Sequence, residues 1–143
     1  MREAASPLAV LVLRLVLGSI MATHGWMKVH HGMANFVQLI QSLGMPGWMA
    51  YVSAWAEFGG GILVLIGLLT RVASLFILLD MLVAIVKVHL GNGLVSHSGK
   101  SGYEFPLALA AIALALALLG AGPFAADWLF GGQPNERRRE ALR

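Results

Sequence analysis

Three ionisable side chains, Arg14, Glu57 and Asp80, lie inside long apolar stretches of the 143-residue chain. By insertion scales, each such group costs about 2.5 to 3.5 kcal/mol at the centre of a spanning helix, so we expect the three to pair. An arginine guanidinium can bridge one or both carboxylates. The pairing could be purely structural and fix the register of the helices. Alternatively, Glu57 or Asp80 could accept protons in a proton relay or beside a bound head group.

A second set of polar residues falls near the ends of the same stretches. His24 and Lys28 are four residues apart and therefore share a helix face. Lys87 and His89 end one later apolar stretch, and the next begins nearby. We expect these groups to form a vestibule that accepts protons or binds an anionic or quinone-like ligand. The binding candidates are His24, Lys28, Lys87, His89, Tyr103 and Glu104, and the proton-handling candidates are Glu57, Asp80 and His24.

The same histidines raise the question of a metal or haem. His24 and His89 could be paired axial ligands from two helices, but hydrogen-bonded polar histidines are the more common arrangement. No Glu-x-x-His pattern occurs, so no metal site is predicted. His30 and His97 fall in predicted loops. The chain has no Cys, so any electron transfer must use a bound or borrowed cofactor.

The elements that would position these groups follow from composition. Hydrophobic residues make up 58% of the chain, charged residues 12%, and the mean hydropathy is +0.77. A soluble domain usually carries about twice that charged fraction. Four apolar stretches, at about 8–27, 48–69, 72–90 and 103–120, each approach the length of a membrane span. The sequence therefore predicts a single domain over 1–143, an all-α integral membrane four-helix bundle.

Charge asymmetry predicts the orientation of this bundle. The stretch 8–27 is read as a spanning helix rather than a cleaved signal peptide, because it is a full span long and holds Arg14. One side of the predicted bundle carries six arginines, and the other carries two lysines. Positively charged loops and tails stay in the cytoplasm, so both termini are predicted inside, with 131–143 as a basic cytoplasmic tail. We expect a multi-pass protein of the bacterial inner (plasma) membrane. The arginines on the inner side are Arg2, Arg71, Arg137, Arg138, Arg139 and Arg143.

Small residues indicate where helices approach one another. Gly59 to Gly61 follow Glu57 directly and could admit a neighbouring helix or a ligand. The stretch 103–120 is rich in alanine, and its small residues could pack inside the bundle or against a second copy in a homo-oligomer. The residues in question are Ala108, Ala111 and Ala115.

Taken in order, these motifs resemble the pattern of DoxX-type membrane proteins over nearly the full chain. The matching segments are Arg14-Leu15 with Gly18, His24-Gly25-Trp26-Met27-Lys28, Glu57-Phe58-Gly59-Gly60-Gly61, Gly67-Leu68-Leu69-Thr70-Arg71, Asp80-Met81, Lys87-Val88-His89, Gly102-Tyr103-Glu104 and Gly120-Ala121-Gly122-Pro123. The resemblance implies a four-helix membrane protein, often described as an oxidoreductase subunit. Similar proteins include quinone-reducing thiosulfate oxidoreductase subunits, and a mycobacterial DoxX protein paired with a sulfurtransferase and a superoxide dismutase.

Two functions from different classes remain open at this point. In the first, the bundle binds a quinone or similar lipid-soluble carrier, histidines and carboxylates handle protons, and a partner redox subunit supplies electrons. This hypothesis predicts a polar pocket that opens to lipid or to the outer face. In the second, the chain is a non-enzymatic scaffold or assembly factor with a closed, salt-bridged core. A transporter is disfavoured because four helices leave little room for alternating access. The expected surroundings are the lipid bilayer, with no nucleic-acid partner.

Overall fold

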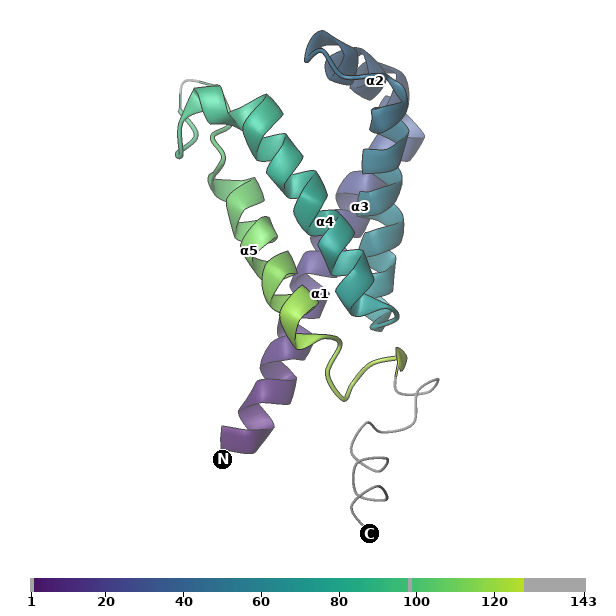
Figure 1. The fold of residues 1–143 in the computed structure, drawn as a ribbon, viewed down its shortest axis with the longest axis vertical. Helices are drawn as coiled ribbons and strands as arrows, with labels where there is room; N and C mark the ends of the chain where they lie inside the picture. The colour runs from purple at the N-terminus through teal and green to yellow at the C-terminus, as the bar shows by residue number, and fades with distance from the viewer. Residues whose placement is uncertain (1, 98, 128–143) are drawn as a thin grey trace.

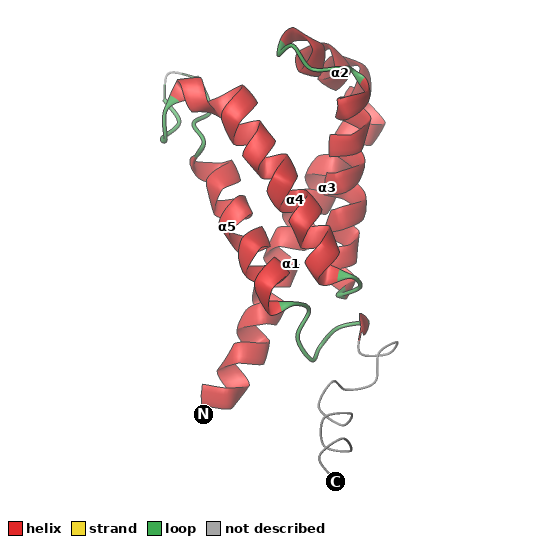
Figure 2. Ribbon diagram, in the orientation of Figure 1, coloured by secondary structure: helices red, strands yellow, loops and turns green. Residues whose placement is uncertain are grey.

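The regular structure is almost entirely helical (Figures 1 and 2). A computed structural model describes residues 2–97 and 99–127. The basic tail predicted for 131–143 lies outside these ranges. The elements in chain order are α1 (Arg2–Met27), the π-helical turn η1 (Lys28–Gly32), α2 (Met33–Ser42), α3 (Trp48–Ile66), α4 (Thr70–Ala84), the π-helical turn η2 (Ile85–His89), the short 3₁₀ turn η3 (Leu90–Asn92) and α5 (Glu104–Leu119).

Three helical stretches are long and apolar enough to cross a membrane, which confirms an all-α membrane bundle. They are Pro7–Ser42, Trp48–Ile66 and Thr70–Asn92. The fourth helix, α5, is apolar but has only 16 residues, or about 24 Å at 1.5 Å per residue. It lies beside α4 in Figure 1 and completes the four-helix bundle.

The segment between α1 and α3 differs from the predicted loop. Residues 28–42 remain helical, first as η1 and then as α2, so His30 lies in a π-helical turn. Gly32, with φ −142° and ψ 10°, departs from helical geometry between η1 and α2. In Figure 1, α2 lies at the ends of α1 and α3 that are farthest from the N-terminus. A ten-residue amphipathic helix is too short to register as a span, which is why the sequence pattern did not reveal it.

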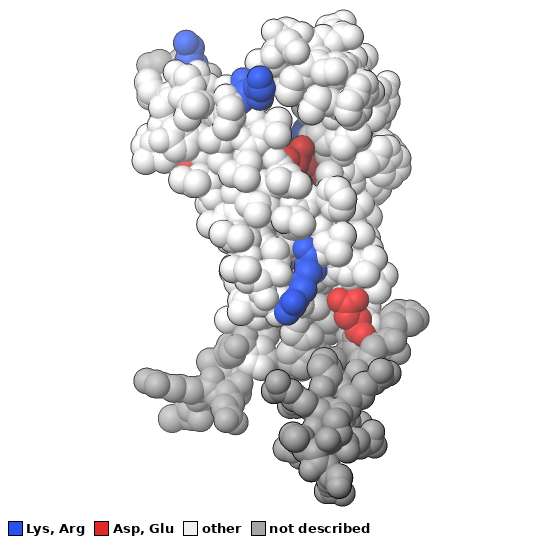
Figure 3. All heavy atoms as spheres, viewed as in Figure 1, with Lys and Arg blue, Asp and Glu red and all other residues white. Residues whose placement is uncertain are grey.

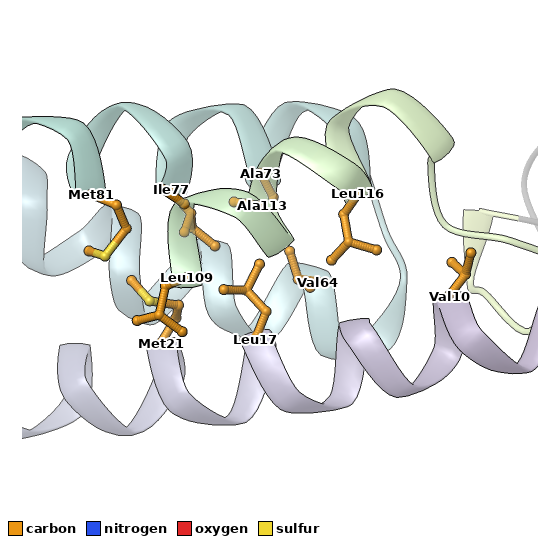
Figure 4. Close-up of a cluster of buried hydrophobic side chains, with 11 residues drawn as sticks. Val10, Leu17, Met21, Val64, Ala73, Ile77, Met81, Leu109, Ala113 and Leu116 are labelled. Atoms are coloured by element: carbon orange, nitrogen blue, oxygen red, sulfur yellow. The ribbon is translucent and has the colours of Figure 1, made fainter. Parts of the chain in front are cut away.

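The apolar core lies between α1, α3, α4 and α5 (Figure 4). Leu17 and Met21 from α1 meet Ile77 from α4 and Leu109 from α5 at its centre. Many other apolar side chains are exposed, as expected where lipid rather than water surrounds the bundle. Figure 3 shows the same apolar surface, on which charged residues are sparse.

Helices α1 and α3 are in contact backbone to backbone along one seam. A side chain on Gly61 would meet the backbone of Ala22, and one on Gly25 would meet the backbone of Phe58. Gly60 faces Ile77 of α4, whereas Gly59 faces open space. Small residues permit this close approach, and the approach sets α1 and α3 in a fixed register. That register brings Lys28 to the level of Glu57.

Candidate functional site: a polar pocket at one end of the bundle

A pocket of about 780 Å³ opens between the helices in the half of the bundle that is opposite the N-terminus. Its walls come from α1, α2, α3 and α4, and from α5 with the loop that precedes it. Most of the lining is apolar, including Met21, Trp48 and Phe105. Its polar and ionisable side chains are His24, Lys28, Ser53, Glu57, Asp80, His89, Ser96 and Ser101. An apolar cavity with a few convergent polar groups is the usual form of a small-molecule site.

One ion pair joins α3 to the start of η1 in this pocket. The ammonium of Lys28 (Nζ) lies 2.7 Å from Oε2 of Glu57. The Glu57 side chain is 5% exposed and the Lys28 side chain 26%. The carboxylate is therefore held inside the protein, while the lysine reaches it from the more open part of the pocket.

A second carboxyl group belongs to the same cluster. Asp80 of α4 lines the pocket and lies close enough to Glu57, Ser53 and Lys28 to interact with all three. Ser53 is one turn before Glu57 on α3, so both side chains point toward α4. Two carboxyls, one hydroxyl and one ammonium thus meet where α1, α3 and α4 converge.

Two π-helical turns lie at the level of the pocket. Lys28 begins η1 and His89 ends η2, so each turn supplies a pocket side chain. A π-helical turn shifts the side chains that follow it around the helix axis, and such turns are frequent at functional sites. Nδ1 of His89 lies 3.0 Å from the carbonyl oxygen of Ser101, and because a carbonyl oxygen only accepts, Nδ1 is the donor of this hydrogen bond.

Helix α2 contributes an aromatic wall above the ion pair. The ammonium of Lys28 lies 4.2 Å from the centre of the Phe36 ring, within the range of a cation–π interaction. Across the pocket, the His24 ring lies 6.0 Å from the ring of Phe105 on α5. Lys28 therefore contacts both the carboxylate and α2, the helix that lies at this end of α1 and α3.

Arg14 does not take part in this cluster, and the predicted bridge from Arg14 to Glu57 and Asp80 is wrong. Its guanidinium is buried and donates four hydrogen bonds to backbone carbonyls. Nε donates to Val64 (3.0 Å), Nη2 to Leu65 (2.9 Å), and Nη1 to Ala121 (2.9 Å) and Phe124 (2.7 Å). Val64 is seven residues beyond Glu57 on α3, a rise of about 10 Å. The three residues therefore occupy two levels of the bundle, and Arg14 lies too far from the two carboxyls to pair with them.

The Arg14 contacts add donors at a helix end. Val64 and Leu65 are in the last turn of α3, where the helix dipole favours a cation. The Val64 carbonyl also accepts from the Gly67 N–H at 3.2 Å. Gly67 caps this helix at φ +75°, and a side chain there would clash with the guanidinium. The segment after α5 returns to the same corner, where the Asp127 carboxylate (Oδ1) accepts from the Leu69 N–H at 2.9 Å.

The remaining predicted ligand residues divide between the pocket and its surroundings. His24, Lys28 and His89 line the pocket, and Lys87 lines a groove beside it. Tyr103 and Glu104 lie outside the pocket lining. Glu104 instead accepts a hydrogen bond from the Ser96 N–H at 3.1 Å, which holds the loop before α5.

Several pocket residues were missed from the sequence, and three of them show why. Ser53 could have been found, because it stands four positions before Glu57 and shares its helix face. Phe36 was missed because its helix was assigned to a loop. Ser101 approaches through the fold of the loop 93–103, which no local pattern specifies.

Together, the bundle and its pocket define a polytopic α-helical membrane protein with ionisable groups enclosed between its helices. The DoxX family model matches residues 9–90, which include Lys28, Glu57, Asp80 and His89. The chain belongs to the DoxX family.

Two similar proteins extend this comparison. The chain is 35% identical over 131 residues to "Putative oxidoreductase CatD" of Bacillus subtilis (strain 168), covering 90% of this chain and 92% of that protein. It is 40% identical over 67 residues to "Inner membrane protein YqjF" of Escherichia coli (strain K12), covering 47% of this chain and 51% of that protein. No solved structure matches the chain.

Proposed function

We propose that the pocket binds the head group of a quinone or a similar lipid-soluble redox carrier. In this proposal, the Lys28–Glu57–Asp80 cluster and His24 handle the protons. The observation that carries the proposal is the pocket itself, which is about 780 Å³ in volume and lined by both carboxyls and both histidines. A scaffold was expected to have a closed, salt-bridged core, and a space of this size favours a ligand-binding role. The name of one relative, "Putative oxidoreductase CatD", agrees with a redox function.

The pocket chemistry suits a carrier that exchanges protons together with electrons. The carbonyl oxygens of a quinone ring accept hydrogen bonds, and Lys28 and a histidine N–H are donors of the right kind. After reduction, the hydroxyls of the quinol become donors, and the carboxylates of Glu57 and Asp80 can accept from them. Ionisable groups inside a membrane protein commonly form proton relays of this type.

The chain contains no Cys for an iron–sulfur cluster or a dithiol, so the electrons need a cofactor that is bound or borrowed. We propose that a partner redox subunit supplies them at the membrane surface. This proposal includes an orientation with the N-terminus in the cytoplasm and the pocket toward the outer face of the plasma membrane, which the positive-inside rule supports through the arginine distribution.

Binding and lipid analysis test this proposal. The protein would be purified in detergent, and its lipid extract and optical spectrum compared with those of the Glu57→Gln and His24→Ala variants. We expect a quinone in the native extract at a fixed ratio to protein, and its loss from both variants while the fold persists. The matched control is Glu104→Gln, the same chemical change outside the pocket lining, which should retain the quinone.

Added ligand provides the second arm of this test. A benzoquinone without a side chain should bind saturably to the native protein and to Glu104→Gln, and roughly tenfold more weakly to Glu57→Gln, equivalent to about 1.4 kcal/mol. Absence of saturable binding to the native protein, together with an extract free of quinone, would refute the proposal and favour the scaffold.

A further inference from the structure

A lipid-facing groove lies beside the pocket, between the start of α3 and the outer face of α4. It encloses about 480 Å³. Its lining is apolar except at one end, where Lys87 stands. The lining residues are Met45, Met49, Leu79, Leu82, Val83, Val86 and Lys87. Leu82 and Val86 are among the exposed apolar side chains of α4.

The groove and the pocket share a wall. Met45, Met49, Leu79 and Val83 line both spaces, and Asp80 follows Leu79 directly on α4. The polar cluster and the apolar groove therefore lie on two sides of the same four side chains. Methionine is flexible and adapts to different ligand shapes, so two of the four can move aside without disturbing the backbone.

The groove also has a direction. Lys87 marks its end near the membrane surface, where a lysine extends its ammonium toward the polar region. Leu79 is eight residues earlier, about 12 Å deeper along α4. The groove thus runs from the interface toward the hydrocarbon region, in the direction that an acyl or isoprenoid chain would take.

We infer that this groove holds the hydrocarbon tail of an amphiphilic ligand whose ring occupies the pocket. The inference rests on the proposed function and narrows it to tailed carriers that enter from the bilayer between α3 and α4. Lipid chains are as apolar as the groove, so the groove adds little attraction of its own. Its role is to provide an exit, because a tail attached to an enclosed ring must leave the pocket somewhere.

A bulky substitution in the groove tests this role. Leu82→Trp would fill the exit, and Leu75→Trp is the matched control, because it lies two turns earlier on the same stripe of α4 and outside both cavities. The probes are a radiolabelled benzoquinone without a side chain and the same ring bearing a decyl chain. Binding would be measured in nanodiscs, with concentrations expressed relative to lipid.

We expect the native protein and Leu75→Trp to bind both probes. Leu82→Trp should bind the tailless ring within about twofold of the native affinity and the decyl form roughly tenfold more weakly. If Leu82→Trp loses affinity for both probes equally, or for neither, the inference that the groove holds a tail is wrong, and the proposed function still stands. If the native protein binds neither probe, the proposed function fails, and the inference about the groove fails with it.

Discussion

The two ends of the bundle each enclose a buried charge, but they use it differently. At the N-terminal end, the guanidinium of Arg14 has four backbone carbonyl partners and is surrounded by the end of α3 and the segment after α5. At the opposite end, Glu57 pairs with Lys28 at the edge of a large pocket. A buried guanidinium with four backbone carbonyl partners indicates a structural charge. A charge pair beside an open cavity indicates a group available to a ligand. Depth in the membrane alone does not distinguish these two roles.

The largest effect on stability should come from the Arg14 end. In Arg14→Met, the part-buried carbonyls of Leu65, Ala121 and Phe124 lose this donor, and each costs about 1 kcal/mol, the low end of the range for buried groups without partners. We therefore expect a loss of about 3 kcal/mol or more, measured by thermal unfolding in detergent. Arg71→Met removes an exposed arginine at the same end and should change stability by less than about 0.5 kcal/mol. Equal stability of the two variants would contradict a structural role for Arg14.

The seam that joins the two ends offers the next contrast. Gly61→Ala places a methyl group against the backbone of Ala22 and should cost about 1 to 3 kcal/mol through overpacking. Gly59→Ala faces open space in the same helix and should be neutral or stabilising by up to about 1 kcal/mol, because alanine favours helix. Thermal midpoints of the two variants provide the measurement. A larger loss of stability in Gly59→Ala than in Gly61→Ala would show that Gly61 is not the residue that packs against the backbone of α1.

The pocket ion pair should respond asymmetrically to the loss of either partner. Lys28→Met leaves the carboxylate of Glu57, which is 5% exposed, without its partner, whereas Glu57→Gln leaves a lysine that is 26% exposed. We expect Lys28→Met to be the more destabilising by about 1 kcal/mol, because a buried unpaired charge is costlier than a partly solvated one. The double variant should recover part of the loss, as a thermodynamic cycle would show. Lys100→Met, a change in an exposed loop lysine, serves as the control.

The smallest effect concerns α2. Phe36→Leu keeps an apolar wall but removes the aromatic ring that lies 4.2 Å from the Lys28 ammonium. The cation–π contribution is about 0.5 to 1 kcal/mol, so stability should fall by no more than that. Ring binding should weaken only a few-fold, measured with the tailless benzoquinone. A loss as large as that of Glu57→Gln would mean that α2, and not the carboxylate, determines affinity.

Composition and hydropathy were sufficient to predict the helical membrane bundle, since apolar stretches of span length have few other structures available in lipid. The polar vestibule was predicted in part. His24, Lys28 and His89 follow from helix ends that meet at one level. The partner of Arg14 could not be deduced, because its carbonyl acceptors arise from how α3 ends and how the chain returns after α5. Helix α2 was missed because a short amphipathic helix gives no span signal.

We propose that the pocket end of the bundle binds a ligand, whereas Arg14 at the other end stabilises the fold. The most direct test measures affinity for the tailless benzoquinone in Glu57→Gln and Arg14→Lys, at a temperature where thermal unfolding shows both to be folded. Lysine keeps the positive charge but has three donors against the four hydrogen bonds made by Arg14. We predict that Arg14→Lys lowers the thermal midpoint and keeps the native affinity, while Glu57→Gln nearly keeps the midpoint and binds roughly tenfold more weakly. Unchanged affinity in Glu57→Gln, or affinity lost only in Arg14→Lys, would contradict a ligand-binding role for Glu57 and a purely structural role for Arg14.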